Sequence, residues 1–423
     1  MLKIHMMRTL CSTLLLSLSL NICAQIDSLR KYYKLGISAY ETQDYSGFLL
    51  NMQRADGFRA FYPPIIYNIG AGYALAGNAE KATEYLKTYL TINSQVDFAA
   101  DTDFAAIKDS EAFSSAVKLA AELSERITAS QHYKQIEDVR HIEAIGVDES
   151  TGAIYLGDVW ARQVCRYEDG KLSVLFDYAE QPELYSVMGI DVDEKNNKLW
   201  ICSAALPQTQ GYTAALEGTS SVFSYDLKTQ SVQHHGTLTA SNTFGDLIVS
   251  RSGKVYISDG SSNKVYTVDE SGNLLVFADL STKTLNLQGL TFDGPEKNIF
   301  VADYILGIFK LNLETRELTK VEFATDIPFK GIDGLYYHKN ALFAIQNGTK
   351  PIRVTQLFLN KEETTVGNYA AFDQNTKYLN EPTQGFIYKR IMVYIANSPW
   401  ADYNDQNEFV GTSDLLLRKI MIK

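Results

Sequence analysis

The chain has 423 residues, of which 45% are hydrophobic and 21% are charged, and its formal net charge at pH 7 is −11. These proportions are typical of a folded globular protein and exclude a disordered chain. The acidic balance, with no cluster of Lys and Arg, excludes nucleic acid as an expected partner, because a phosphate backbone is itself anionic. The 26 tyrosines and 20 phenylalanines favour strands, since aromatic side chains suit a pleated, half-buried surface.

Residues 1–24 have the pattern of an export signal. Lys3 and Arg8 give a basic start, and residues 10–20 form a short apolar run. The run is too short for a membrane span, which needs about 20 apolar residues, and no later run is long enough. We therefore expect an exported protein, periplasmic or extracellular, without a membrane span. Lipidation at Cys23 is the alternative, although the residue before this cysteine is not small.

Two cysteines remain after the expected cleavage, Cys165 and Cys202. Two cysteines are too few for a disulfide framework. We expect two buried free thiols in strands, and a single bridge between neighbouring repeat units is the alternative.

Residues 25–130 show mainly helical periodicity. The stretch 67–87 predicts two helices joined by a Gly-Asn turn, and residues 101–126 predict a further helical pair. Gly36 lies 34 residues before Gly70, which is the tetratricopeptide period, and the segment resembles that family. Such a segment either binds a partner protein in a groove or serves as a spacer or cap, and the sequence leaves both open.

Residues 131–423 show the period of two that is typical of strands. A unit of an apolar strand, a turn and an aromatic-rich second strand recurs six times. The second strands end at Asp158, Ser203, Asp259, Asp303, Gln346 and Asn397. Spacings of about 43 to 56 residues are typical of four-stranded propeller blades. We predict a mainly β fold, a six-bladed β-propeller preceded by a short helical repeat segment. A β-sandwich is the alternative, which six similar units disfavour.

The propeller topology predicts where polar groups gather. Consecutive strands are antiparallel, so the start of each first strand and the end of each second strand lie on one face. The expected inner ring around this mouth consists of Glu143, Met188, Gly245, Gln288, Asp333 and Gln384. Two long connections, residues 204–219 and 398–413, leave second strands toward the same mouth and could cover it. We expect the ring to close where a strand near Ile136–Val139 pairs with the last strand, Leu415 to Ile422.

Residues 140–423 resemble the SMP-30/gluconolactonase/LRE family. The resemblance is carried by Gly331-Ile-Asp-Gly-Leu, Ala344-Ile-Gln-Asn-Gly, Glu381-Pro-Thr-Gln-Gly and Ile395-Ala-Asn-Ser-Pro-Trp. It implies a divalent cation at the mouth, held by Glu, Asn and Asp, that polarises a sugar lactone and activates water. Glu143 stands at the family's Glu position, whereas Gly245 and Gln288 replace the family's Asn and Asp.

From this resemblance we predict a rebuilt oxygen site. Glu143, Asp246 and Asp333 are the expected ligands of a divalent cation, calcium or another, and Glu143 and Asp333 the expected catalytic residues. The expected substrate-binding residues are Gln288, Gln384, Asn397 and Trp400. The acids that end second strands have an equally ordinary alternative role, which is to bond the backbone of neighbouring loops.

Two functions follow from these expectations. The first is a metal-dependent hydrolase of a lactone, an ester or a sugar-derived small molecule bound at the propeller mouth. The alternative is a non-catalytic propeller that binds a ligand at its mouth and a partner protein at its helical segment. The fold cannot choose between them, because propellers support many unrelated functions.

Overall fold

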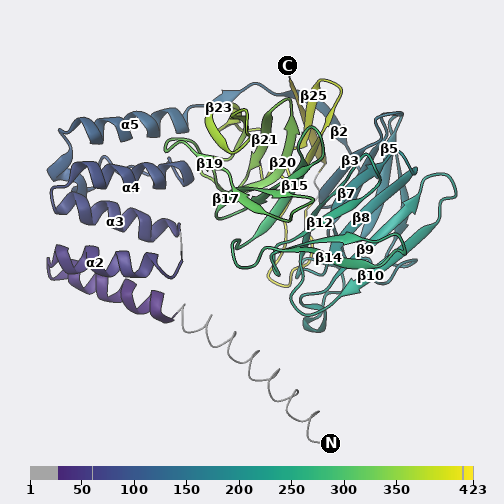
Figure 1. Ribbon diagram of the computed structural model, residues 1–423, viewed down its shortest axis with the longest axis horizontal. Helices are drawn as coiled ribbons and strands as arrows, with labels where there is room; N and C mark the ends of the chain where they lie inside the picture. Colours follow the sequence, from purple (N-terminus) through teal and green to yellow (C-terminus); the bar gives the residue numbers. More distant parts are fainter. Residues whose placement is uncertain (1–26, 60, 412–413, 423) are drawn as a thin grey trace, which may run out of the picture. The chain divides into compact units, whose positions relative to one another are not determined.

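The computed structural model describes residues 27–59, 61–411 and 414–422. The chain divides into two compact units, Met1–Leu123 and Ser124–Lys423. In Figure 1, which is coloured by sequence, the helices of the first unit are purple to blue and the strands of the second unit run on to yellow. The expected export signal and Cys23 lie outside the described residues. Among the residues described, no helix is long and apolar enough to cross a membrane.

The first unit is helical, which confirms the expected helical segment. Residues 27–41 form a helix. The helices after it are α2 (Tyr45–Asp56), α3 (Pro63–Leu75), α4 (Ala79–Ile92), the 3-10 helix η1 (Thr102–Ile107) and α5 (Glu111–Ser124). The third pair was expected over residues 101–126, and its first member is a 3-10 helix of 6 residues. A helix this short supports few i to i−4 bonds, so the tighter form is the usual outcome.

The α3–α4 pair illustrates why this stretch is helical. Pro63 is the first residue of α3. Proline is favourable there because an N–H group in the first turn has no hydrogen-bond partner within the helix, so its absence costs nothing. The Asn78 side chain caps α4 by accepting a hydrogen bond of 3.0 Å from the Lys81 N–H. A Cβ atom at Gly70 would lie 3.4 Å from the Ala82 carbonyl oxygen, so the glycine permits the close packing that its position predicts.

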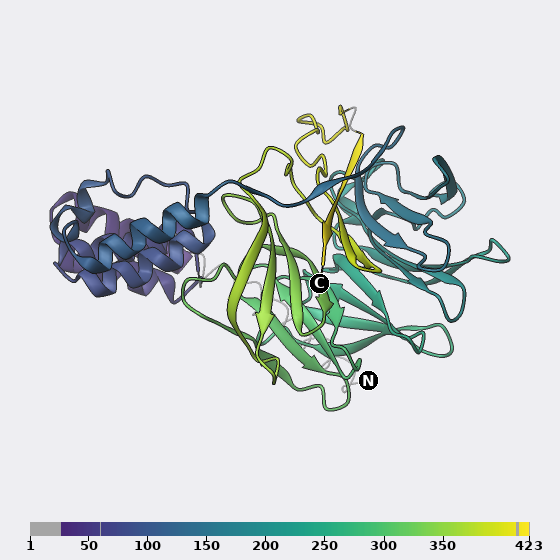
Figure 2. The same ribbon diagram turned by 90° about the horizontal axis from the view of Figure 1, so that it is seen from above.

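The second unit contains six sheets, each a propeller blade of four antiparallel main strands (Figure 2). In blades 1 to 5 the main strands run outward from the axis in chain order, whereas the outer strand of blade 6 comes from the start of the unit. The strands of the first three blades are β3 (Ile142–Val147), β4 (Ile154–Asp158), β5 (Gln163–Glu168) and β6 (Lys171–Asp177); β7 (Ser186–Asp193), β8 (Lys198–Ala204), β9 (Ser220–Asp226) and β10 (Val232–Leu238); and β11 (Phe244–Val249), β12 (Val255–Asp259), β13 (Lys264–Val268) and β14 (Leu274–Asp279).

The remaining blades include three strands from outside the regular order. Blade 4 consists of β15 (Leu287–Phe292), β16 (Asn298–Asp303), β17 (Gly307–Asn312) and β18 (Leu318–Lys320). Blade 5 consists of β20 (Ile332–His338), β21 (Ala341–Gln346), β22 (Arg353–Leu359) and β23 (Thr365–Gln374), with β1 (Ile127–Thr128) and β19 (Glu322–Phe323) added to β23. Blade 6 consists of β24 (Gly385–Tyr388), β25 (Ile391–Ile395), β26 (Leu415–Met421) and β2 (Gln131–Ile136).

The ring of blades is closed. The innermost strands contact one another in the order β3, β7, β11, β15, β20, β24 and back to β3. The outer strand of blade 6 is β2, which pairs antiparallel with β26. The predicted six-bladed propeller and its closure beside the last strand are therefore confirmed, with the closing strand at Gln131–Ile136. Cys165 and Cys202 are free and buried, which confirms the thiols expected in strands.

Side-chain to backbone hydrogen bonds link neighbouring innermost strands. The Asp191 carboxylate of β7 accepts the Val249 N–H of β11 at 2.7 Å. The Asp246 carboxylate of β11 accepts the Leu290 N–H of β15 at 3.1 Å. At the later junctions the acceptors are hydroxyl groups, Thr291 for the Tyr337 N–H at 3.0 Å and Tyr336 for the Gly385 N–H at 2.6 Å. These bonds satisfy backbone groups that the blades bury at the axis.

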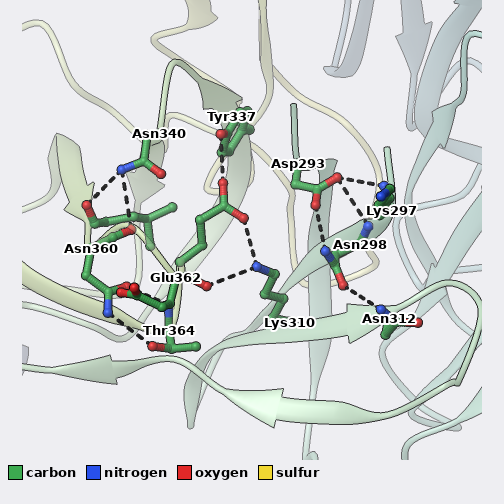
Figure 3. A network of polar contacts seen from close by, with 12 residues as sticks. Asp293, Lys297, Asn298, Lys310, Asn312, Tyr337, Asn340, Asn360, Glu362 and Thr364 are labelled. Atoms are coloured by element: carbon green, nitrogen blue, oxygen red, sulfur yellow. Dashed lines mark hydrogen bonds and ion pairs between the residues drawn. The ribbon is translucent and has the colours of Figure 1, made fainter. Parts of the chain in front are cut away.

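A further polar network joins blades 4 and 5 (Figure 3). The Lys310 ammonium of β17 contacts the Glu363 carboxylate at 2.8 Å, and the Tyr337 hydroxyl of β20 donates to the same carboxylate at 2.8 Å. Lys310 also donates to the Glu362 carbonyl oxygen at 3.3 Å. The turn between β22 and β23 is therefore tied to both blades.

Glycines on the innermost strands let the blades approach closely. A Cβ atom at Gly289 would lie 2.4 Å from the Asp333 carbonyl oxygen of the next blade. This distance is too short for a carbon–oxygen contact, and the obstacle is backbone, which cannot rotate away. A glycine follows four of the six inner-ring positions, and Gly289 shows the steric reason for it at this blade.

We expect Gly289→Ala to lower the free energy of unfolding of the propeller by about 1–3 kcal/mol, the usual cost of overpacking. Gly367→Ala is the matched control, because a Cβ atom there meets nothing within 4 Å. Urea unfolding followed by tryptophan fluorescence measures this unit, since all 3 tryptophans lie in it. Equal stability of the two variants would contradict the steric explanation.

Candidate functional site

One face of the propeller contains a cavity of about 390 Å³, which we call the mouth cavity. Its lining is mainly amide, carboxyl, hydroxyl and aromatic. The lining residues are Glu143, Met188, Leu206, Gln208, Thr243, Gly245, Gly260, Ser261, Asn286, Leu287, Gln288, Tyr304, Asp333, Asn347, Glu381 and Trp400. No Lys, Arg or His is among them. The cavity therefore suits a neutral, hydroxyl-rich ligand better than an anion.

The mouth cavity contains most of the inner ring that the strand pattern predicts. Glu143, Met188, Gly245, Gln288 and Asp333 all line it. Each lies at or near the start of a first strand, and these starts converge because the blades radiate from one axis. Both long connections also reach the cavity, one through Leu206 and Gln208 and the other through Trp400.

Gln384, the sixth member of the expected ring, crosses the axis. Its side-chain amide donates to the Met188 carbonyl oxygen at 2.5 Å and to the Gly245 carbonyl oxygen at 3.2 Å. Its exposed fraction is 6%. Gln384 thus links blade 6 to blades 2 and 3, and its amide hydrogens are used within the protein rather than left for a substrate.

A second hollow of about 270 Å³, the rear cavity, is lined by Gln384 together with Asp191, Asp246 and Tyr336. Asp246 was expected beside Glu143 and Asp333, but it lines this cavity instead. A register shift in the β11–β12 pairing falls between Phe244 and Asp246, and Gly245 faces the mouth. The residue at the shift, Gly245, thus occupies the mouth position, and Asp246 lies one residue further along the strand.

The environment of Asp246 is that of a structural carboxyl group. It accepts backbone hydrogen bonds from Leu247 at 2.8 Å and Leu290 at 3.1 Å. Burial raises the pKa of Asp246 to about 8 in spite of these bonds. The expected group of Glu143, Asp246 and Asp333 is therefore not brought together, and only two of its members share the mouth cavity.

Glu143 is the most enclosed carboxyl group of the mouth cavity, with an exposed fraction of 4%. Its Oε2 accepts hydrogen bonds from the Ser398 hydroxyl at 2.6 Å and the Trp400 indole N–H at 3.0 Å. Burial, followed by the nearby charge of Asp333, raises the pKa of Glu143 to about 8, and the two hydrogen bonds oppose this rise. The group is therefore largely protonated at neutral pH.

Asp333 is less enclosed and is held by amides. The Asn347 side chain donates to its carboxylate at 2.7 Å, and the Tyr304 hydroxyl in turn donates to the Asn347 carbonyl oxygen at 2.9 Å. Burial raises the pKa of Asp333 to about 6, the Asn347 bond opposes the rise, and the charge of Glu381 adds to it. At neutral pH this carboxyl group is mainly ionised, in contrast to Glu143.

The other expected substrate-binding residues are divided between the cavity and the scaffold. Gln288 and Trp400 line the mouth cavity, and the Gln288 amide donates to Asn286 Oδ1 at 2.8 Å. Asn397 is not among the lining residues. Its side chain accepts the Leu416 N–H at 2.7 Å and donates to the Asp414 carbonyl oxygen at 2.8 Å.

The acids that end second strands also bond backbone groups. Asp158 accepts the Ala161 N–H at 2.7 Å, and Asp259 accepts the Thr243 N–H at 3.0 Å. Asp303 accepts four N–H groups from residues 285–286 and 305–306. These contacts favour a structural role for the three aspartates, which is to hold the backbone of neighbouring loops.

The sequence did not single out His141 or Ser398 as site residues. His141 is fully buried, and its Nε2 lies 3.0 Å from the Ser398 hydroxyl oxygen. Its Nδ1 lies 2.7 Å from the hydroxyl oxygen of Tyr403, which belongs to the second of the two long connections. The available signal was the position of His141 directly before β3 and two residues before Glu143.

The residues present do not fit the cation that the family resemblance implies. Within residues 27–59, 61–411 and 414–422, no three His, Cys, Asp or Glu side chains are arranged to hold a metal ion. The Oε2 atom of Glu143 also already accepts two hydrogen bonds. We therefore assign no metal ligand in the mouth cavity.

Comparisons with known proteins give distant structural similarities. No family model and no curated protein matches the chain. Similar solved structures include a gluconolactonase from Xanthomonas campestris, with 14% identity and a TM-score of 0.47 over 71% of this chain and 93% of that one. A calcium-binding regucalcin from Agrobacterium tumefaciens has 14% identity and a TM-score of 0.46 over 69% and 94% of the two chains. A putative oxidoreductase (glucose dehydrogenase) from Thermus thermophilus has 9% identity and a TM-score of 0.46 over 69% and 100%.

The raised pKa of Glu143 predicts how stability depends on pH. The folded protein keeps this proton up to about pH 8, whereas an unfolded chain loses it near the ordinary glutamate pKa of 4.5. The free energy of unfolding therefore falls as pH rises between these values. We expect the melting temperature of Glu143→Gln relative to the wild type to be higher at pH 9 than at pH 5, by about 2 °C or more. The exposed Glu314 provides a control, since Glu314→Gln should show no such change in calorimetry. A relative melting temperature of Glu143→Gln that stays constant from pH 5 to 9 would show that this carboxyl group titrates normally.

Proposed function

We propose that the propeller binds a neutral, hydroxyl-rich small molecule in the mouth cavity and hydrolyses a lactone or ester bond in it. The observation that carries this proposal is the presence of two carboxyl groups, Glu143 and Asp333, in one cavity lined by amides and aromatic rings and by no basic side chain. Amides and carboxylates bond sugar hydroxyl groups, and aromatic rings such as Trp400 pack against sugar carbons.

The two carboxyl groups have complementary roles. Asp333, mainly ionised at neutral pH, takes a proton from a water molecule as the water oxygen attacks the carbonyl carbon. Glu143, mainly protonated, donates its proton to the alkoxide oxygen released when the carbon–oxygen bond breaks. Oε2 accepts two hydrogen bonds, so the transferred proton belongs to Oε1. Environments that separate two carboxyl pKa values are the usual way to obtain an acid and a base in one site.

The lining also accounts for substrate choice and product release. Gln288 uses one amide hydrogen on Asn286 and keeps the other for a substrate oxygen. Hydrolysis of a lactone converts a neutral molecule into a hydroxy carboxylate. In a cavity with carboxyl groups and no basic side chain, that anion is repelled, which favours its departure.

The mechanism predicts a bell-shaped dependence of kcat on pH. Activity should rise as Asp333 loses its proton near pH 6 and fall as Glu143 loses its proton near pH 8. Asp333→Asn should lower kcat by about 10²–10⁴-fold, and Glu143→Gln should remove the alkaline limb along with most of the activity. Glu314→Gln, on an exposed turn of blade 4, is the control. A profile of the wild type without either limb would contradict these assignments.

Removal of divalent cations tests the family expectation directly. We expect a chelator to leave both kcat and the melting temperature unchanged, because the described residues form no three-ligand group and Glu143 is held by Ser398 and Trp400. Activity lost with chelator and restored by calcium would overturn the metal-free mechanism in favour of a metal-assisted one.

A non-catalytic binding protein is the second candidate. The enclosure of Glu143, with an exposed fraction of 4%, favours it, because an acid must reach the leaving group. This candidate predicts that neutral sugars and lactones raise the melting temperature without being converted. A screen of lactones and esters, read by product formation and by melting temperature together, separates the two.

Export and a partner protein at the helical unit complete the proposal. The pattern of residues 1–24 supports export, and fractionation of cells with sequencing of the mature N-terminus tests it. The helical periodicity of residues 25–130 supports a docking role. Chemical crosslinking of the full chain in cell extracts, compared with the propeller variants above, tests that role.

A further inference from the structure

A continuous series of hydrogen bonds runs from Glu143 to the segment 398–411, which we call the strap. Ser398 Oγ lies 2.6 Å from Glu143 Oε2, and His141 Nε2 lies 3.0 Å from Ser398 Oγ. Tyr403 Oη lies 2.7 Å from His141 Nδ1. Three contacts of hydrogen-bond length therefore connect four side chains from β3, its flanking loop and the strap.

Two directions of donation satisfy these contacts, and we assign the one that begins at the partly exposed Tyr403 hydroxyl. A neutral imidazole carries one proton, so one ring nitrogen donates and the other accepts. If the Tyr403 hydroxyl donates to Nδ1, then Nε2–H donates to Ser398, and the Ser398 hydroxyl donates to Glu143. Ser398 also lies 3.2 Å from the Ile142 carbonyl oxygen, but the Glu143 carboxyl oxygen is closer, at 2.6 Å.

The surroundings of His141 keep it neutral and dry. Its ring contacts Trp400 edge to face at 4.6 Å and lies near Tyr403 at 5.6 Å and Phe409 at 6.4 Å between ring centres. Glu143 Oε2 lies 3.9 Å from Nε2 and is the one carboxyl oxygen paired with this ring among the described residues. Burial lowers the pKa of His141 to about 3. A proton that passes through this ring therefore does not stay on it.

Charged groups act on the two ends of the series. The charge of Asp158 adds to burial in raising the pKa of Tyr403, and Glu143 contributes in the same direction. At the other end, Asp333 raises the pKa of Glu143. Tyr403 and Glu143 are therefore both protonated at neutral pH. Such a pathway transfers a proton only after Glu143 has donated its own.

We propose that Tyr403, His141 and Ser398 form a proton relay that returns a proton to Glu143 from the strap side. This role in turnover rests on the proposed function, whereas the hydrogen-bond order is a property of the free protein. When Glu143 has lost its Oε1 proton, the Ser398 proton moves to Oε2, the His141 Nε2 proton moves to Ser398, and the Tyr403 proton moves to Nδ1. A half-turn of the Glu143 carboxyl group about its Cγ–Cδ bond then places the new proton at the former Oε1 position, on the cavity side. Solvent then returns one proton to the phenolate oxygen of the partly exposed Tyr403. One proton thus enters the series at Tyr403 for each proton that reaches Glu143.

The relay answers a specific difficulty of the mouth cavity. With a product bound there, Glu143 is closed to bulk water on the cavity side, and Asp333 carries the proton taken from the attacking water. A path through the strap reaches Glu143 from behind and leaves the cavity occupied. His141, Ser398 and Tyr403 are positioning residues in this scheme, because none of them lines the mouth cavity.

The hydrogen-bond order can be measured without a substrate. Nitrogen-15 NMR of the labelled full chain, with His141→Gln used for assignment, reports the protonation of each ring nitrogen. We expect a neutral His141 with the proton on Nε2 from pH 5 to 9. A cationic ring at pH 6, or a proton on Nδ1 in this range, would overturn the relay whether or not the protein proves to be a hydrolase.

The role in turnover is tested with Tyr403→Phe, which removes one oxygen atom. We expect kcat to fall about 10-fold or more with KM unchanged, and the solvent deuterium effect to change from a several-proton to a one-proton dependence. Phe409→Leu is the matched control, since it packs against the same ring but carries no proton. Ser398→Ala provides a second variant if Tyr403→Phe does not fold.

The outcomes separate the two proposals. A wild-type kcat and deuterium dependence in either relay variant would overturn the relay while leaving lactone hydrolysis in place. Absence of turnover with every lactone and ester would refute the proposed function, and the NMR measurement would then decide the relay alone. Phe409→Leu behaving like Tyr403→Phe would show that the strap acts by packing, which also overturns the relay.

Discussion

Close packing of six innermost strands around one narrow axis determines where the polar groups of this propeller lie. Gly289 shows how tight the packing is, because a single added carbon would meet the backbone of the next blade at 2.4 Å. At such distances no space for water remains beside the strands, and each buried N–H, carbonyl and carboxyl group needs a partner within the protein. The mouth and rear cavities adjoin the starts of the innermost strands that are packed in this way.

The carboxyl groups near the axis meet this requirement in two ways. Asp191 and Asp246 accept backbone N–H groups of the following blade and thereby join neighbouring blades. Glu143 accepts side-chain donors from the strap instead, and Asp333 accepts an amide. A carboxyl group that accepts backbone N–H groups is part of the scaffold. A carboxyl group that accepts side-chain donors beside a cavity can change its protonation during a reaction.

The strap gives the mouth cavity a chemical character that the blades alone do not supply. Trp400 contributes both a hydrogen bond to Glu143 and an aromatic surface of the cavity. Ser398 and Tyr403 connect the buried His141 with the same carboxyl group. A cation in the manner of the resembling family would compete with these donors for Glu143 Oε2. The proposed acid–base mechanism and the proposed relay therefore depend on the same arrangement around Glu143.

The sequence alone determined the architecture, because each blade repeat produces a pattern among residues that are close together along the chain. The alternation of apolar residues, the turn residues and the spacing of second-strand ends depend only on neighbours along the chain, and they predicted six blades, the closing pair and the mouth position of Glu143, Gln288 and Asp333. Tertiary structure decided the rest. Gly245 occupies the mouth position of blade 3 while its neighbour Asp246 lines the rear cavity, and the Gln384 side chain spans the axis. The meeting of His141 with Ser398 and Tyr403 joins residues more than 250 positions apart, and no local pattern encodes a contact that ring closure creates.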